Sequence, residues 1–156
     1  VGIYFGVEID EAFAAIGYFV PSNNRSQMVR TERNSLIVDA YNANPTSMAA
    51  ALDNFEMALS ESKVALLGEM RELGEDSVAE HIAIVEKVKG MDIAKVCYVG
   101  EEFRKALEAA GTAENAMWFE SSEKLALYLS ENRLDGALVL VKGSRGIQME
   151  KTIPQL

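Results

Sequence analysis

The sequence has little of what many enzymes use for chemistry, with one cysteine and one histidine among its 156 residues. A single cysteine cannot form an internal disulfide, and Cys97 lies in an apolar run that predicts a small core residue. His81 has no cysteine pair to accompany it, which argues against a metal site, so we expect a structural or surface histidine. Because the two residues fall in separate predicted elements, a nucleophilic triad is not supported either.

Two nucleotide-binding motifs and two kinds of segment are also absent. The sequence contains neither GxxxxGK[ST] nor GxGxxG, which disfavours a self-sufficient nucleotide-binding domain. It has no apolar stretch of about 18 residues and no signal-peptide pattern, so we take the cytoplasm as the default location. Its 24 acidic and 15 basic residues give a net charge of −9, which disfavours nucleic acids and anionic membranes as partners.

The length fits one domain with a sizeable core and a fragment of another. The sequence begins on Val1, inside an apolar segment, which we interpret as the interior of a longer chain. Helical spacing within this segment is shown by Ile9, Phe13, Ile16 and Val20. A turn-forming stretch over 21–24 then predicts a linker between residues 1–21 and a domain over 22–156. The alternative is an ordinary N-terminal helix that packs on the domain's own sheet.

Short apolar runs alternate with amphipathic helical patterns along the rest of the chain. Strands are predicted over 35–41, 63–67, 95–99, 115–119 and 136–141. Helices are predicted over 45–59 (with Met48, Leu52, Phe55 and Leu59 on one stripe), over 75–89 (with Val78, Ile82, Val85 and Val88), around Phe103, Leu107 and Ala110, and around Leu125 and Leu129. This alternation indicates an α/β fold with a Rossmann-like, mostly parallel sheet of about six strands and helices on both faces.

Two ends of this pattern differ from the rest. Residues 27–32 alternate loosely and are followed by a tight connection at 33–34, which predicts that the first strand is antiparallel to the next. The pattern over 147–153 is too weak to predict a further helix.

Polar side chains gather where the predicted strands end. Asp39, Tyr41, Asn42 and Asn44 follow one buried strand, while Asn44 and Pro45 are typical of a helix N-terminus, whose free N–H groups attract anions. Glu69 follows a second strand, and the last strand is followed by Lys142, Ser144 and Arg145. In open α/β sheets this edge is where ligands bind.

This combination of charges suits a zwitterionic amino acid or dipeptide. Lys142 and Arg145 can hold a carboxylate or phosphate, and acceptors beside them can hold an amine. The alternative is that Asn42 and Asn44 only cap, that Asp39 holds the linker, and that the two cations are solvated.

Four segments resemble those of a known family: 24–27 (NRSQ), 39–45 (DAYNANP), 67–75 (LGEMRELGE) and 141–145 (VKGSR). In this order, and over nearly the whole chain, they resemble the C-terminal domain of the Mur ligases, and among these the branch that adds D-alanyl-D-alanine. The resemblance implies an ATP-dependent ligase in which an acyl phosphate forms on UDP-N-acetylmuramoyl-tripeptide and the dipeptide amine displaces the phosphate. It also implies that residues 1–21 are a remnant of the central ATP-binding domain.

The resemblance further implies how the work is divided between domains. The phosphate loop, the Mg²⁺ ligands and a modified lysine belong to the central domain and match nothing here, so this chain alone is expected to be inactive, without catalytic residues, metal or cofactor of its own. Arg25 is implied to face the ATP phosphates and Asp39 to lie near the nucleotide. The positions implied to hold the dipeptide are Tyr41, Asn42, Asn44, Lys142, Ser144 and Arg145. Some family members continue into an alanine racemase, and an end without a closing helix would suit such a junction.

Two other classes of protein stay open at this point. One is a stand-alone, non-enzymatic α/β module that binds a small anionic ligand. The other is a receiver-like signalling domain, which is disfavoured because the expected acidic cluster is missing beyond Asp39. The apolar segment 1–7 favours the ligase, since a self-contained module has no reason to begin in this way.

Overall fold

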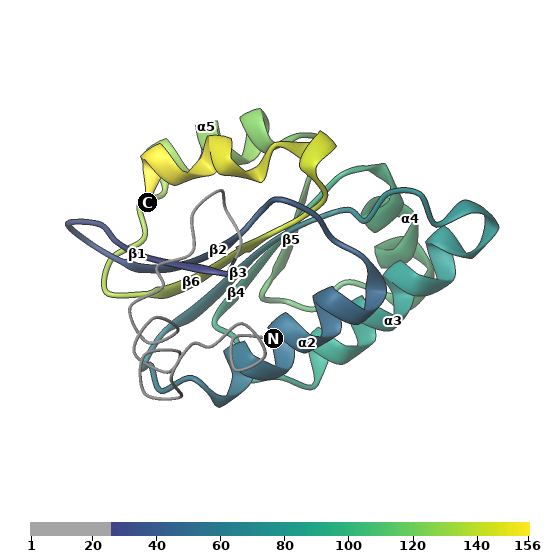
Figure 1. The fold of residues 1–156 in the computed structure, drawn as a ribbon, viewed down its shortest axis with the longest axis horizontal. Coiled ribbons are helices and arrows are strands. Elements are labelled where there is room, and N and C mark those ends of the chain that lie inside the picture. Colours follow the sequence, from purple (N-terminus) through teal and green to yellow (C-terminus); the bar gives the residue numbers. More distant parts are fainter. Residues whose placement is uncertain (1–25) are drawn as a thin grey trace, which may run out of the picture.

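The computed structural model describes residues 26–156, so the predictions for residues 1–21 and for Arg25 lie outside the described residues. Within the described range, the strands form a six-stranded sheet in the order β1-β2-β6-β3-β4-β5 (Figure 1). They are β1 (Gln27–Arg30), β2 (Ser35–Asp39), β3 (Lys63–Gly68), β4 (Lys95–Val99), β5 (Ala116–Phe119) and β6 (Leu138–Lys142). β1 is antiparallel to β2 and every other pair is parallel, which confirms the predicted fold class.

Helices cover both faces of the sheet (Figure 1). One face carries α2 (Pro45–Met57), α3 (Ser77–Lys89) and α4 (Glu101–Ala110), and the other carries α5 (Ser122–Glu131) with the 3₁₀ helix η4 (Met149–Gln155). Two shorter 3₁₀ helices, η2 (Gly74–Asp76) and η3 (Arg145–Ile147), lie in connecting segments. From β2 to β5 the chain moves across the sheet in one direction, and right-handed crossovers place α2, α3 and α4 on the same face. From β5 to β6 the chain moves back in the opposite direction, so the same handedness places α5 on the other face.

The core consists of two layers separated by the central strands β3 and β6. Residues that alternate along a strand point to opposite faces, so Leu140 packs with the α2 to α4 layer and Val141 with the α5 layer. Cys97 is buried in the second layer, as predicted, and burial raises the pKa of its thiol to about 12. This cysteine is therefore a packing residue and not a nucleophile.

Several element boundaries differ from the prediction for local reasons. α2 ends at Met57 because Ala58 adopts an extended conformation, which leaves Leu59 fully exposed and off the predicted stripe. β2 ends at Asp39 and not at residue 41, and β6 begins at Leu138, because Gly136 has a positive φ of 68° in the preceding turn.

Two helices, α3 and η4, differ from the sequence prediction. The buried stripe of α3 includes His81 and Ile84 in place of Val78 and Ile82, which are only half-buried. The chain does have a closing helix, η4, which the weak pattern over 147–153 did not predict because the helix buries only Met149 and Thr152. This finding removes the observation behind the expected racemase junction. Among residues 26–156, no helix has the length and apolar character of a membrane span.

Candidate functional site

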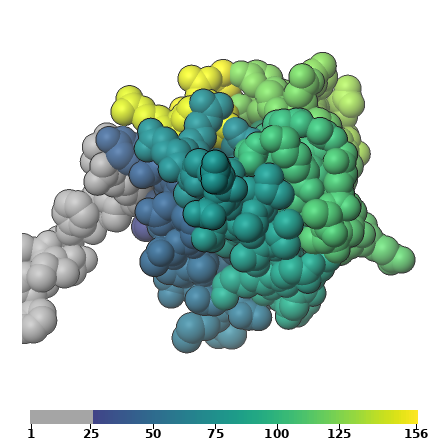
Figure 2. All heavy atoms as spheres, turned by 90° about the vertical axis from the view of Figure 1, so that its right-hand side faces the viewer, coloured from purple at the N-terminus to yellow at the C-terminus, as the bar shows by residue number. Residues whose placement is uncertain are grey.

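The candidate site lies at the carboxyl edge of the sheet, where the chain leaves neighbouring strands toward opposite faces. After β2 the chain passes to α2, whereas after β6, the neighbour of β2, it passes to η3 and η4 on the other face. Figure 2 faces this edge, where segments from the blue, teal and yellow parts of the chain meet. Such a divergence opens a crevice between adjacent strand ends, the usual ligand position in open α/β sheets.

An open hollow of about 320 Å³ occupies this crevice. The residues that line it are Asp39, Tyr41, Asn42, Asn44, Ser47 and Lys142. All but Ser47 were predicted as site residues from the sequence. The structure therefore brings together side chains that are separated by about a hundred positions in the chain, and the predicted convergence on one rim is confirmed.

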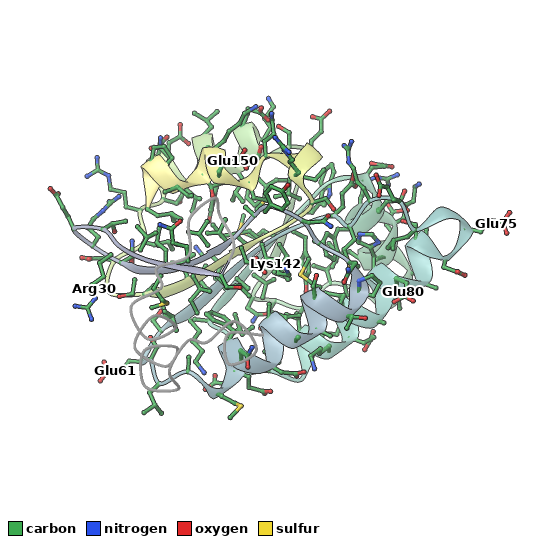
Figure 3. All side chains as sticks on the ribbon, viewed as in Figure 1. Arg30, Glu61, Glu75, Glu80, Lys142 and Glu150 are labelled. Atoms are coloured by element: carbon green, nitrogen blue, oxygen red, sulfur yellow. The ribbon has the colours of Figure 1, made fainter. Side chains whose placement is uncertain are left out.

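An ion pair lies at the base of the hollow. Asp39 and Lys142 are partners in the β2–β6 register, and Lys142 Nζ lies 2.5 Å from Asp39 Oδ2 and 3.3 Å from the carbonyl oxygen of Asn42. The Lys142 side chain is 1% exposed and that of Asp39 20%. Figure 3 places Lys142 inside the fold, whereas Arg30, Glu61 and Glu75 project from its periphery. The alternative that Lys142 is solvated is wrong, because a buried ammonium requires a carboxylate partner.

Asp39 has a second partner on the side where the described chain begins. Its Oδ1 accepts a hydrogen bond from the backbone N–H of Ser26 at 3.2 Å. Ser26 has a positive φ of 45°, an unusual conformation for a residue other than glycine, asparagine or aspartate. One carboxylate thus joins Ser26 to the buried cation of β6, whereas the predicted linker over 21–24 lies outside the described residues.

The two asparagines have local roles that leave them on the rim. Asn44 Oδ1 accepts the N–H of Ser47 at 2.8 Å and forms a capping box with it, so the predicted cap of α2 is confirmed. Asn42 Oδ1 accepts the N–H of Ala43 at 2.9 Å. Both asparagines are exposed and line the hollow, so their local bonds orient them without removing them from solvent.

Arg145 and Tyr41 close the rim from opposite sides. The Arg145 guanidinium lies over the Tyr41 ring, 5.5 Å from its centroid, and both residues are exposed. A cation over an aromatic face is held loosely by the ring quadrupole and keeps its donors available. This contact joins the segment after β2 to the segment after β6.

Ser144 is a buried link between loops. It is 3% exposed, and its Oγ accepts the N–H of Arg71 at 2.9 Å and donates to the carbonyl oxygen of Ala43 at 3.4 Å. These bonds tie together the segments that follow β2, β3 and β6. The predicted contact between Ser144 and a ligand stays a prediction, because this hydroxyl already bonds to both loops.

Two residues after β3 belong to the same edge: Glu69, which the sequence placed there, and Arg71, which the sequence analysis missed. Glu69 Oε2 accepts the N–H of Glu102 at 3.0 Å, and its Oε1 lies 3.7 Å from Arg71 Nε. Arg71 is 56% exposed and lies so close to Gly146 that a Cβ there would be 2.9 Å from Nη1. Arg71 lies at the carboxyl end of a parallel strand, as Lys142 does, so the position of strand ends in the sequence also predicts Arg71 at this edge. Within residues 26–156, no group of histidine, cysteine, aspartate and glutamate side chains is arranged to hold a metal ion.

Fold and site together define an α/β domain that presents a polar, ligand-sized hollow at the switch point of a mostly parallel sheet. Residues 24–145 match the family model described as "Mur ligase, glutamate ligase domain", and the chain belongs to this family. The family resemblance inferred from four short segments is therefore confirmed.

Individual relatives agree with this assignment. A UDP-N-acetylmuramoyl-tripeptide--D-alanyl-D-alanine ligase from Treponema pallidum is 32% identical over 154 residues, which cover 97% of this chain and 33% of the relative. Among solved structures, MurF from Acinetobacter baumannii is similar with a TM-score of 0.86 and 26% identity, over 99% of this chain and 35% of that one. MurF from Thermotoga maritima in complex with ADP shares the fold, with a TM-score of 0.80 and 20% identity over 99% of this chain and 34% of that one. The chain spans about a third of the length of the curated relatives it matches.

Proposed function

We propose that this chain is the C-terminal, substrate-positioning domain of a longer, MurF-type ligase that joins D-alanyl-D-alanine to UDP-N-acetylmuramoyl-tripeptide with consumption of ATP. The observation that carries the proposal is the meeting of the β2 and β6 ends around the Asp39–Lys142 pair, in a domain of the Mur ligase family. The name shared by the relatives supports the choice of dipeptide and acceptor. We expect the ligase to act in the cytoplasm, where ATP is available.

In this proposal the rim holds the dipeptide at both of its charged ends. Arg145 is an exposed cation with forked donors, which suits the terminal carboxylate. The side-chain oxygens of Asn42 and Asn44 provide acceptors for the amine. Lys142 forms an ion pair with Asp39 at the base of the hollow, which holds that carboxylate in place as the hollow fills.

Arg25 and Asp39 are proposed to face the nucleotide. Arg25 lies outside the described residues, but it directly precedes Ser26, whose N–H bonds to Asp39. This bond holds Ser26, the residue next to Arg25 in the sequence, at the carboxyl end of β2. We propose the domain division predicted from the sequence, in which residues 1–21 belong to the preceding ATP-binding domain and residues 22–156 form the C-terminal domain.

The chemistry follows from holding three reactants in line. The acceptor carboxylate takes the terminal phosphoryl group of ATP and ADP leaves; the dipeptide amine then attacks the acyl carbon, phosphate leaves, and the amine loses a proton. Residues of this chain hold the amine in position, and closure of the domain excludes the water that would hydrolyse the acyl phosphate. Mg²⁺ and most of ATP are proposed to bind to the preceding region, because residues 26–156 contain no cluster that fits the metal.

The test compares the longer ligase with the 156-residue chain. We expect phosphate release by the longer protein to require both D-alanyl-D-alanine and the UDP-linked tripeptide, and the chain alone to release none. Replacing D-alanyl-D-alanine by L-alanyl-L-alanine is the matched control and should abolish turnover. Turnover by the chain alone, or a longer protein that ignores the dipeptide, would overturn the proposal. Tight calorimetric binding of an unrelated anion by the chain would instead favour the stand-alone binding module.

A further inference from the structure

His81, the single histidine of the chain, lies fully buried on α3 beneath the loop that follows β3. Its Nε2 accepts the backbone N–H of Met70 at 2.9 Å, and its Nδ1 lies 2.6 Å from the carbonyl oxygen of Ser77. A backbone N–H can only donate and a carbonyl oxygen can only accept. The ring is therefore the neutral tautomer with its proton on Nδ1. Phe103 packs edge-to-face against this ring, with centroids 4.7 Å apart, and fixes its plane.

The loop 69–73 is held from two sides through consecutive peptide groups. The N–H of Met70 bonds to His81, and the next N–H, that of Arg71, bonds to Ser144 Oγ at 2.9 Å. Ser144 bonds in turn to the carbonyl oxygen of Ala43. His81 is thus the last member of a continuous series of contacts that runs from the end of β2, through the end of β6, to α3. The loop that it anchors carries Arg71.

Arg71 is an exposed cation at the same carboxyl edge, where it lines hollows next to the one around Asp39 and Lys142. Its side chain is more than half exposed, and its guanidinium lies beside Gly146 in η3, the element that also begins with Arg145. The carboxylate of Glu69 is 3.7 Å from Nε, a distance that orients the guanidinium without a close hydrogen bond. Arg33, in contrast, is held in place by a hydrogen bond from its Nη2 to the carbonyl oxygen of Gln155.

We propose that Arg71 binds an anionic group of a substrate, a carboxylate or a phosphate, at the carboxyl edge, and that His81 is the positioning residue that holds Arg71 there. The inference rests on the proposed ligase function and adds to it two residues that act together. The neutral ring is required because a proton on Nε2 would face the N–H of Met70, donor against donor. The loop would then lose its inner anchor while Ser144 still held its outer one.

The surroundings of His81 keep the ring neutral against several nearby carboxylates. Burial lowers the pKa of His81, while Glu102 on α4, Glu69 on the loop, Glu80 on α3 and the carbonyl oxygen of Ser77 act in the opposite direction. We therefore expect the anchor to be intact at neutral pH and to be lost as the pH falls through the lowered value.

The test uses the longer ligase with separate titrations of dipeptide, UDP-linked tripeptide and ATP. Arg71→Ala should raise KM about tenfold for the one substrate whose anion Arg71 binds, with a smaller change in kcat. Arg133→Ala removes an exposed arginine at the other end of the sheet and should change none of the three values. An unchanged KM for all three substrates in Arg71→Ala overturns the role of Arg71.

His81 is tested by two replacements, one without and one with a hydrogen-bond acceptor for the N–H of Met70. His81→Leu removes the acceptor for Met70 and should raise the same KM as Arg71→Ala, with little further change in the double variant. His81→Gln keeps an acceptor oxygen near the position of Nε2 and should restore most of the affinity. If His81→Leu raises all three KM values alike, or if Gln does not rescue, the positioning role is wrong.

Amide hydrogen exchange of Met70 separates this inference from the ligase function. In the unaltered 156-residue chain, protection of that amide should fall as the pH is lowered, after correction for intrinsic exchange, and should be unchanged by Arg71→Ala. This measurement needs no turnover and no folded His81→Leu protein. If the protection of this amide does not depend on pH, the anchoring role of His81 is wrong even when the ligase is active. If the ligase is inactive but the amide is pH-sensitive, the proposed function is wrong and the anchoring role of His81 is still supported.

Discussion

The two ends of the sheet contain buried polar residues of opposite kinds. At the amino end, Asn34 is 5% exposed, donates to the backbone oxygens of Leu134 and Leu156, and accepts the N–H of Ala137. At the carboxyl end, one of the buried polar residues is charged: this is Lys142, whose partner Asp39 borders a hollow. A neutral amide satisfied by backbone groups fastens segments together, whereas a charged pair beside solvent can also respond to a ligand. The comparison separates stability from function within one sheet.

The largest expected effect comes from breaking the pair at the carboxyl end. Asp39→Ala leaves a buried ammonium without a carboxylate and should lower the free energy of unfolding by about 3 kcal/mol. Lys142→Met should cost less, because the partly exposed carboxylate of Asp39 can be hydrated. Urea unfolding of the 156-residue chain measures both. If Lys142→Met proves the more damaging change, the buried cation is not what Asp39 compensates.

A change at the amino end should lower stability without changing activity. Asn34→Ala leaves the carbonyl oxygen of Leu134 and the N–H of Ala137 without their partner, while the Leu156 carbonyl keeps its bond from Thr31 Oγ1, and the change should cost about 2–3 kcal/mol in the free energy of unfolding. At a temperature where the variant is folded, kcat and KM of the longer ligase should be unchanged. A specific loss of dipeptide affinity in Asn34→Ala would contradict the separation of the two ends.

Arg25 should affect catalysis and leave stability alone. In the longer ligase, Arg25→Ala should lower kcat about tenfold or more, because this cation is proposed to reach the ATP phosphates. Thermal unfolding should hardly change. Arg30→Ala is the matched control, since Arg30 is the last residue of β1, pairs with Ser35 at the amino end of the sheet and projects from the periphery (Figure 3). An unaltered kcat in Arg25→Ala would count against the role.

The smallest effect is a pH dependence that belongs to the carboxyl end. The pKa of His81 is lowered in the folded chain, so its contribution to stability is complete above the ordinary value of about 6.5 and is lost as the pH falls through the lowered value. The unfolding free energy should fall by at most about 1.4 kcal/mol per pH unit in this range. His81→Gln should lack this component, and Asn34→Ala should keep it. Identical pH profiles for the unaltered chain and His81→Gln would refute the assignment.

Most of the site could be predicted because it follows from the order of strands and loops. Once Leu36–Val38 and the last aliphatic run were taken as parallel strands, Asp39 and Lys142 had to lie on one edge, whatever their distance in the sequence. Arg71 was missed although the same rule applies to it. His81 was expected to be either structural or at the surface, and the structure buries it. Its contact with Met70 could not be predicted, since helical spacing alone put Val78 and Ile82 on the buried stripe of α3.

The sequence by itself determined the alternation of strands and helices, the capped start of α2 at Asn44, and the family, because these depend on local patterns and short segments. Only the tertiary structure decided that Lys142 is a buried partner of Asp39, that Ser144 joins three loops and that η4 closes the fold. The reason is physical: burial, charge pairing and loop contacts depend on which segments become neighbours, and β2 and β6 become neighbours only when the whole sheet has formed.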